Sequence, residues 1–172
     1  MRVPILSVAL LAAIAWAGTA AELQATMRKV SENGTGAEIG TVTVTEGGGG
    51  AVFATDLHDL PPGEHGFHVH EKGGCGPGPN DQGLVVAGGA AGGHWDPEGT
   101  KKHLGPEGHG HLGDLPVLTV GADGTAKEEL TAPRTKDPGA VRGRALVIHA
   151  GSDNYADGPS RSAGVVPGSP AE

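Results

Sequence analysis

Polar and apolar residues alternate over short stretches along most of this chain, and no stretch carries a convincing helical period. Side chains two residues apart in a strand lie on the same face, so the alternation predicts strands with one face towards a core. Turn-forming pairs such as Asn33-Gly34 separate the stretches. We therefore predict an all-β sandwich or barrel. The expected strands are Glu22–Ser31, Ile39–Glu46, Ala51–Leu57, Glu64–Glu71, Val117–Val120, Lys127–Thr131 and Ala145–His149.

The segment between Lys72 and Leu115 contains no predicted strand and is rich in glycine, proline and histidine. Loops of this length within a compact domain are usually functional or disordered. Metal coordination can order a chain that has too few apolar groups to order itself, so the histidines favour a functional loop.

The N-terminus carries one charged residue, Arg2, followed by an apolar run over residues 3–17 and four small residues at 18–21. This pattern is typical of a secretory signal peptide, here residues 1–21. A membrane anchor is the alternative, but the run is shorter than the roughly 20 residues that a spanning helix needs. Residues 22–172 are expected to form a single domain, large enough to bury about 68–70% of its extended-chain surface.

The formal net charge is −8, and it becomes −9 when Arg2 leaves with the signal peptide. Nucleic acids and anionic membranes repel an anionic surface, so neither is an expected partner of the mature protein. An anionic substrate would be attracted by bound metal ions and nearby cations rather than by the net charge.

Six of the nine histidines lie in glycine-rich surroundings. His68 and His70 are two apart in an expected strand, so both can reach one metal ion. His94 and His149 complete a set of four imidazoles, which suits copper in both oxidation states. A second set suits tetrahedral zinc with three nitrogens and one carboxylate: His94, His103, His111 and Asp114.

The alternative is that these are ordinary polar loop residues, but it explains neither their order nor the surrounding glycines. Outside the two sets, three histidines are expected to face solvent: His58, His65 and His109. Phe67 and Trp95 are expected to pack in the core. Lys101 and Lys102 are expected to be solvated, and they can help to draw in an anion.

Four segments resemble those of the bacterial copper,zinc superoxide dismutases: Gly66-Phe67-His68-Val69-His70-Glu71, Gly92-Gly93-His94-Trp95-Asp96-Pro97, Gly110-His111-Leu112-Gly113-Asp114-Leu115-Pro116 and Ile148-His149-Ala150-Gly151. The resemblance covers about residues 22–159 and implies the Greek-key β-sandwich or barrel of that family. It assigns copper to His68, His70, His94 and His149, and zinc to His94, His103, His111 and Asp114. Asp153 matches the carboxylate that orients one histidine from each site.

The resemblance implies an oxidoreductase that converts superoxide, its small-molecule substrate, to oxygen and hydrogen peroxide. Copper would alternate between two oxidation states, and His94, which bridges the metals, would be the catalytic residue that carries a proton. A periplasmic location is implied, with secretion as the alternative, and the protein would be a monomer or a homodimer. The rival interpretation is a periplasmic copper-binding or copper-delivery protein with the same fold and little dismutase turnover.

Past Pro159 the pattern of the family fails. Its members continue with an arginine that binds the substrate anion, a cysteine and the last strand, whereas residues 160–172 of this chain read differently. The codons that these residues allow can encode the family tail in another reading frame, so a frameshift is one interpretation and a natural tail is the other. With the tail as written, Cys75 lacks its disulfide partner, the last strand is missing or altered, and activity is impaired.

Overall fold

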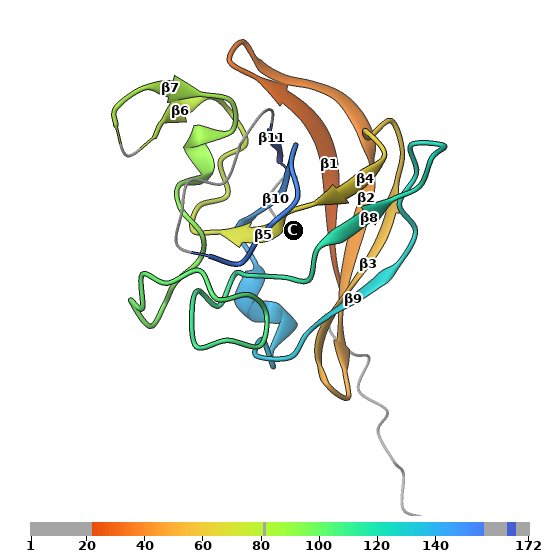
Figure 1. Cartoon of the computed structure of the whole chain (residues 1–172), viewed down its shortest axis with the longest axis vertical. Coiled ribbons are helices and arrows are strands. Elements are labelled where there is room, and N and C mark those ends of the chain that lie inside the picture. Colours follow the sequence, from red (N-terminus) through yellow and green to blue (C-terminus); the bar gives the residue numbers. More distant parts are fainter. Residues whose placement is uncertain (1–21, 81, 157–164, 168–172) are drawn as a thin grey trace, which may run out of the picture.

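The computed structural model describes residues 22–80, 82–156 and 165–167, and nearly all of its regular structure is β-strand (Figure 1). The strands in the described residues are β1 Leu23–Ser31, β2 Gly34–Gly47, β3 Gly50–Leu57, β4 Gly63–His65, β5 Phe67–His70, β6 Gly78–Pro79, β7 Val85–Val86, β8 Leu118–Val120, β9 Glu129–Ala132, β10 Ala145–His149 and β11 Val165–Pro167. Two short 3₁₀ helices accompany them, η1 Gly89–Ala91 and η2 Pro138–Val141. The all-β prediction is therefore confirmed.

The largest sheet has the order β1-β2-β3-β9, and a second sheet has the order β11-β10-β5. Two-stranded ladders, β4-β8 and β6-β7, complete the set. β3 and β9 are antiparallel neighbours, although residues 58–128 separate them in the chain. Such a long return to a neighbouring strand is the connection typical of Greek-key folds.

The core lies between the two main sheets. In β1, Leu23, Ala25 and Met27 are buried while Gln24 is exposed, as the alternation predicts. Phe53 of β3 and Phe67 of β5 meet edge to face, with ring centroids 6.1 Å apart. Phe67 precedes His68 in β5, so this contact joins the two sheets at the strand that carries His68 and His70.

The expected strand Glu64–Glu71 is divided at Gly66 into β4 and β5, which belong to different sheets. The backbone of Gly66 does not bond to β8, the strand that pairs with β4. Its N–H donates to Gly151 O, and its carbonyl accepts from His149 N. The chain therefore changes sheets at this residue. The segment 72–115 was predicted to lack a good strand, and its described residues hold only the two-residue strands β6 and β7 and the helix η1.

The last strand, expected to be missing or altered, is present as β11. This three-residue strand from the tail pairs antiparallel with β10, from Val147↔Pro167 to His149↔Val165, and it lies close to β1. The edge of β10 is thus partly covered rather than unpaired. The expected signal peptide lies outside the described residues. In the part of the chain that the structure describes, no helix has the length and apolarity to cross a membrane.

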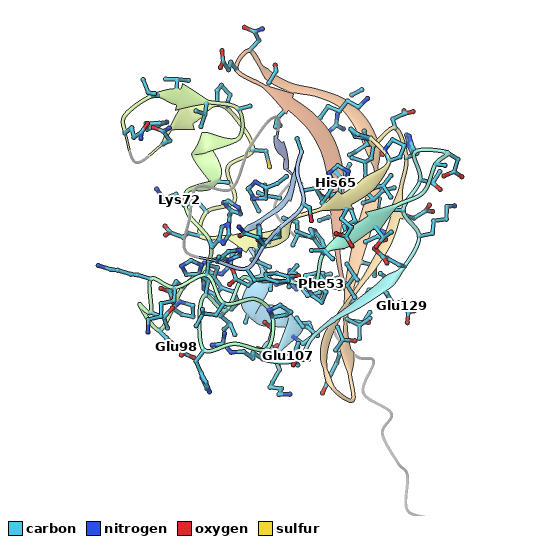
Figure 2. All side chains as sticks on the ribbon, viewed as in Figure 1. Phe53, His65, Lys72, Glu98, Glu107 and Glu129 are labelled. Atoms are coloured by element: carbon cyan, nitrogen blue, oxygen red, sulfur yellow. The ribbon has the colours of Figure 1, made fainter. Side chains whose placement is uncertain are left out.

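One side-chain expectation is wrong. His58 and His109 are exposed, as predicted, but His65 is only 3% exposed (Figure 2). Its two ring nitrogens lie 2.7 Å from the carbonyl oxygen of His149 and 2.8 Å from that of Pro61. These two acceptors replace water and make burial of the imidazole tolerable.

Candidate metal centre

β5 and β10 place three buried or half-buried imidazoles side by side. His68 and His70 lie two apart on β5. Because Val147 pairs with His68 and Ile148 with Phe67, His149 lies one residue beyond the end of the β5–β10 ladder, next to His68. Within the described residues, His68 Nδ1, His70 Nε2 and both ring nitrogens of His149 are buried without a hydrogen-bond partner. Buried polar atoms are normally satisfied, so this convergence of bare nitrogens points to a ligand.

His94 joins these three residues from the long loop. One ligand atom from each of His68, His70, His94 and His149 lies within 4.8 Å of the others. The loop reaches them because His70 and His94 form a β-bridge, and because His70 Nδ1 lies 2.8 Å from Gly92 O. That bond leaves Nε2 of His70 for a metal.

A second ligand group shares His68 and His94 with the first. The atoms within 4.8 Å of one another belong to His68, His94, His103 and Asp114. His111, which the sequence analysis places in this group, lies at its edge, with Nδ1 3.5 Å from Asp114 Oδ1. The four predicted zinc ligands are therefore together, with His68 as an additional neighbour.

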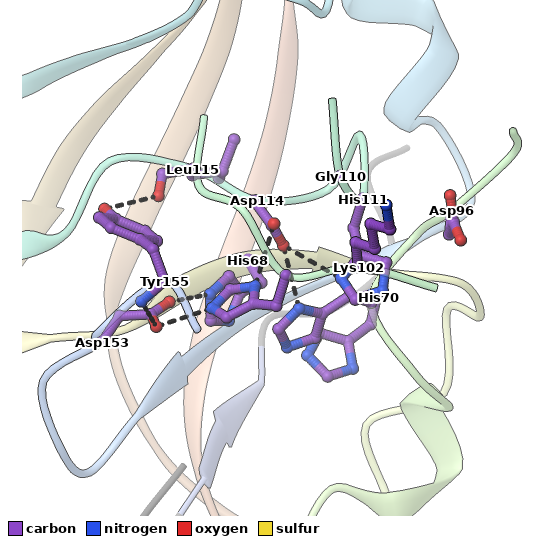
Figure 3. Close-up of polar contacts among 12 residues, drawn as sticks. His68, His70, Asp96, Lys102, Gly110, His111, Asp114, Leu115, Asp153 and Tyr155 are labelled. Atoms are coloured by element: carbon purple, nitrogen blue, oxygen red, sulfur yellow. Dashed lines mark hydrogen bonds and ion pairs between the residues drawn. The ribbon is translucent and has the colours of Figure 1, made fainter. Parts of the chain in front are cut away.

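Two carboxylates tie the imidazoles to one another (Figure 3). Asp114 approaches His94 Nδ1 at 3.1 Å and His103 Nδ1 at 3.0 Å. Asp153 approaches Nε2 of His68 at 2.6 Å and Nε2 of His103 at 2.7 Å, so it links one residue from each group. Sequence reasoning missed the support of Asp153 by Tyr155, whose N–H donates to Asp153 Oδ1 and whose hydroxyl donates to Leu115 O.

The environment keeps the strand histidines neutral. Burial, assisted by the neighbouring imidazoles, lowers the pKa of His68 to about 4, of His70 to about 3 and of His149 to about 2. A neutral imidazole has a lone pair to offer a metal ion. These three residues therefore do not have to release a proton at pH 7 before they bind.

The loop side has the opposite electrostatics. Hydrogen bonds to Asp114 and Asp153 raise the pKa of His103 to about 9. Burial raises the pKa of both carboxyls, but hydrogen bonds from His103 and from His94 or His68 outweigh it and hold both pKa values well below their usual range. Anionic oxygens beside imidazoles form a donor set that suits Zn²⁺.

Gly113 lets the loop approach β5 closely enough to deliver Asp114. Its carbonyl accepts from Val69 N, and its N–H donates to Trp95 O. A Cβ at this position would lie 2.2 Å from Val69 O, closer than real Cβ atoms come to any atom. Asp114 follows directly and forms a β-bridge with His68.

A cavity of about 790 Å³ opens over the histidines. Its lining includes His70, His94 and His149, together with the cations Lys72 and Lys101. Lys101 is exposed, as predicted, and its backbone has a positive φ of 54°, with its N–H held by Asp96 Oδ2 at 2.7 Å. Phe67 and Trp95 pack in the core as expected, and Arg144 lies over the Trp95 ring.

Comparison with known proteins gives a consistent answer. Residues 38–167 match the family model described as copper/zinc superoxide dismutase. The chain is 52% identical over 155 residues to a Cu-Zn superoxide dismutase of Salmonella typhimurium, covering 90% of this chain and 89% of the relative. It is 49% identical over 154 residues to that of Escherichia coli, covering 89% and 88%.

Solved structures show the same likeness. The Cu/Zn superoxide dismutase from Brucella abortus superposes with a TM-score of 0.81 at 43% identity, covering 87% of this chain and 99% of the other. A monomeric enzyme from Salmonella enterica gives 0.76 at 47% identity, covering 88% and 100%. The family match runs past Pro159 to residue 167.

Proposed function

This chain belongs to the copper/zinc superoxide dismutase family, and we propose that its two overlapping histidine groups are the copper and zinc sites of that activity. The reaction converts two superoxide ions and two protons to oxygen and hydrogen peroxide. Copper, when bound, supplies the one-electron oxidation and reduction, while zinc supplies positive charge and fixes its ligands. The observation that carries the assignment is that the two groups overlap at His68 and His94, and that of these two it is His94 whose ring contacts Asp114, at 3.1 Å.

The copper set is His68, His70, His94 and His149. Its support is the bare nitrogens: Nδ1 of His68 and Nε2 of His70 are free because the other nitrogen of each ring faces Asp153 or Gly92 O. A ring nitrogen that donates its proton to such an acceptor fixes the tautomer, and the second nitrogen is then a ligand.

The zinc set is His94, His103, His111 and Asp114, as the resemblance implies. Asp114 supports this set because it lies next to all three imidazoles, at 3.0 to 3.5 Å. His103 donates its Nε2 proton to Asp153 and turns Nδ1 towards Asp114. Asp153 thereby sets the orientation of one imidazole in each site at once.

His94 is the catalytic residue of this proposal. Its Nδ1 faces Asp114, so Nε2 is the atom that faces the other group and exchanges a proton with the substrate. The cavity exposes this imidazole to small molecules, while burial of His68 and His70 limits access by water. Superoxide is an anion, and in the cavity wall Lys72 and Lys101 offset the acidic Glu71 and Asp96 on a chain whose net charge is negative.

The rival interpretation, a copper-binding or copper-delivery protein, is not favoured, because the relatives are dismutases and the zinc ligands are all present. The deciding experiment loads the mature protein with copper and zinc and measures the removal of pulsed superoxide. A rate well above that of an equal concentration of free copper supports the assignment. His94→Ala should fall to the background, whereas the exposed His109→Ala should not. A loaded protein no faster than free copper contradicts the dismutase proposal.

We also propose that residues 1–21 direct export to the periplasm, where they are removed. The support is the short apolar run followed by small residues, and the presence of a single cysteine remains the unusual feature of such an exported chain. N-terminal sequencing of the protein from the periplasmic fraction should find Glu22 or its neighbour first. Recovery from the culture medium would favour secretion, and an intact N-terminus in the membrane fraction would contradict cleavage.

For the oligomeric state, we propose a monomer over the homodimer, because one of the similar solved structures is described as monomeric. Sedimentation equilibrium of the mature protein tests this, and a mass twice that of the chain would contradict it.

A further inference from the structure

Arg134, which lies just after β9, reaches into the loop that carries the zinc ligands. Its Nη1 donates to three backbone carbonyls of that loop: Gly108 O at 2.6 Å, Gly110 O at 2.9 Å and His111 O at 3.3 Å. Its Nη2 lies 3.8 Å from Glu98 Oε2, and its side chain is 17% exposed. A guanidinium is charged at every relevant pH and presents its donors in a rigid fork, so it suits several fixed acceptors.

The loop depends on such contacts because it has little else. Residues 96–114 contain no strand or helix, and Figure 2 shows Glu98 on the outer side of this region. Its two limbs meet where His111 N donates to Lys102 O, and a Cβ at Gly110 would lie 2.4 Å from that same oxygen. Arg134 contacts both limbs, through Glu98 on one and through residues 108–111 on the other.

We propose that Arg134 is a positioning residue for zinc. It binds the backbone carbonyls of residues 108–111 and so fixes the position of the His111 imidazole. The inference rests on the proposed zinc site. Without Arg134, residues 108–111 would be less ordered before zinc binds, and the conformational entropy lost when zinc orders them weakens zinc binding. In the part of the chain that the structure describes, Arg134 forms no hydrogen bond or ion pair with the copper ligands on β5 and β10, so we expect copper binding to be unaffected.

The test compares Arg134→Met and Arg134→Lys with a matched control. Lys136, two residues on, also donates to a backbone carbonyl, Gly49 O at 3.0 Å, but in a turn remote from the zinc ligands. Dissociation constants for zinc and for copper are measured on the metal-free mature protein by competition with a chromophoric chelator. For Arg134→Met we expect zinc binding about 10- to 100-fold weaker, the range for outer partners of metal ligands, and copper binding within about 3-fold of wild type.

Arg134→Lys keeps the charge but has a single nitrogen, so its zinc affinity should lie between that of Arg134→Met and wild type. Lys136→Met should match wild type for both metals. Zinc affinity of Arg134→Met within 3-fold of wild type overturns the inference, and so does an equal loss for both metals. If Arg134→Met does not fold, Arg134→Lys decides by the same criteria. A wild-type protein that binds no zinc refutes the proposed zinc site itself, which is a different result.

Discussion

On one side of the metal centre, His68, His70 and His149 project from β5 and β10, two paired strands whose other side chains form the core. On the other side, His103 and His111 lie in a segment without regular structure, held by backbone contacts, carboxylates and Arg134. Packing of the core fixes the positions of the strand ligands even when no metal is bound. The loop ligands depend mainly on polar contacts, with Leu112 packed against the edge of the core, so their order depends more on the metal.

Removal of both metals should separate the two sides most sharply. We expect amide hydrogen exchange in residues 96–114 to become more than about 100-fold faster, because structural zinc supplies folding free energy directly to its loop. Amides of β5 and β10 should change only a few-fold. Mass spectrometry of exchange in loaded and metal-free protein measures both regions at once. Equal acceleration in strands and loop would show that the two sides form one cooperative unit.

The next largest effect is expected where one residue serves both sides. Asp153→Asn retains one acceptor but places an NH₂ group against Nε2 of either His68 or His103. That imidazole then adopts the wrong tautomer, and metal affinity at its site should fall about 10- to 100-fold. Asp56→Asn, an equal change of charge at an exposed ion pair with Lys127, is the control. Unchanged affinities, measured by chelator competition, would remove Asp153 from the proposed role.

Gly113 joins the loop to the strands, so a side chain there should strain that junction. Gly113→Ala forces a shift against Val69 O, and we expect a loss of about 1–3 kcal/mol in the free energy of unfolding. At Gly48, a Cβ would meet nothing within 4 Å, so Gly48→Ala should stay within about 0.5 kcal/mol of wild type. Urea unfolding of both variants measures this. Equal effects would mean that the close approach at Gly113 is not tight in solution.

The strand side was the easier one to predict from sequence. Ala145–His149 forms β10 with the expected bounds, because a short apolar run near glycines is a local signal. His68 and His70 share a face because they are two residues apart in a strand, which is also a local property. The metal ligands were predicted from the histidine motifs and their order along the chain, which do not depend on a predicted fold. The predicted set therefore included ligands from both sides.

What the sequence did not reveal depends on partners far away in the chain. His65 can be buried because the carbonyl oxygen of His149, 84 residues away in the chain, accepts a hydrogen bond from its imidazole. Gly66 breaks an alternating stretch because its backbone pairs with Gly151 and His149. Arg134 binds carbonyl oxygens, which every residue has, so no motif marks its acceptors. Each of these features needs the tertiary structure before it can be recognised.

The two sides should also respond oppositely to pH in the metal-free protein. An unfolded histidine titrates near 6.5, and the folded pKa is about 4 for His68 and about 3 for His70. The unfolded chain therefore binds more protons, and stability that is complete above pH 6.5 falls as the pH drops towards 4, by roughly 1 kcal/mol per pH unit for each group. His103, raised to about 9, contributes stability that is complete below pH 6.5 and is lost as the pH rises through 9.

Urea unfolding between pH 4 and 10 measures both limbs. His70→Gln should flatten the acid limb alone, and His103→Gln should flatten the alkaline limb alone. Loss of the same limb in both variants would contradict the division of the centre into a neutral strand side and a charged loop side.

The smallest expected effect concerns how the substrate approaches rather than how the site is built. Lys101 lines the cavity, whereas its neighbour Lys102, with the same charge, is absent from the lining. If local charge steers superoxide, Lys101→Gln should lower kcat/KM on the order of two- to five-fold at low ionic strength, and salt should remove the difference. The affinity of the loaded protein for azide, an anion that can be titrated by spectroscopy, should fall in parallel. Lys102→Gln lowers the net charge equally, so an equal effect of both substitutions would assign steering to the whole surface. An effect of Lys101→Gln alone would assign steering to the cavity wall on the loop side of the centre, where Asp96 holds the backbone N–H of Lys101.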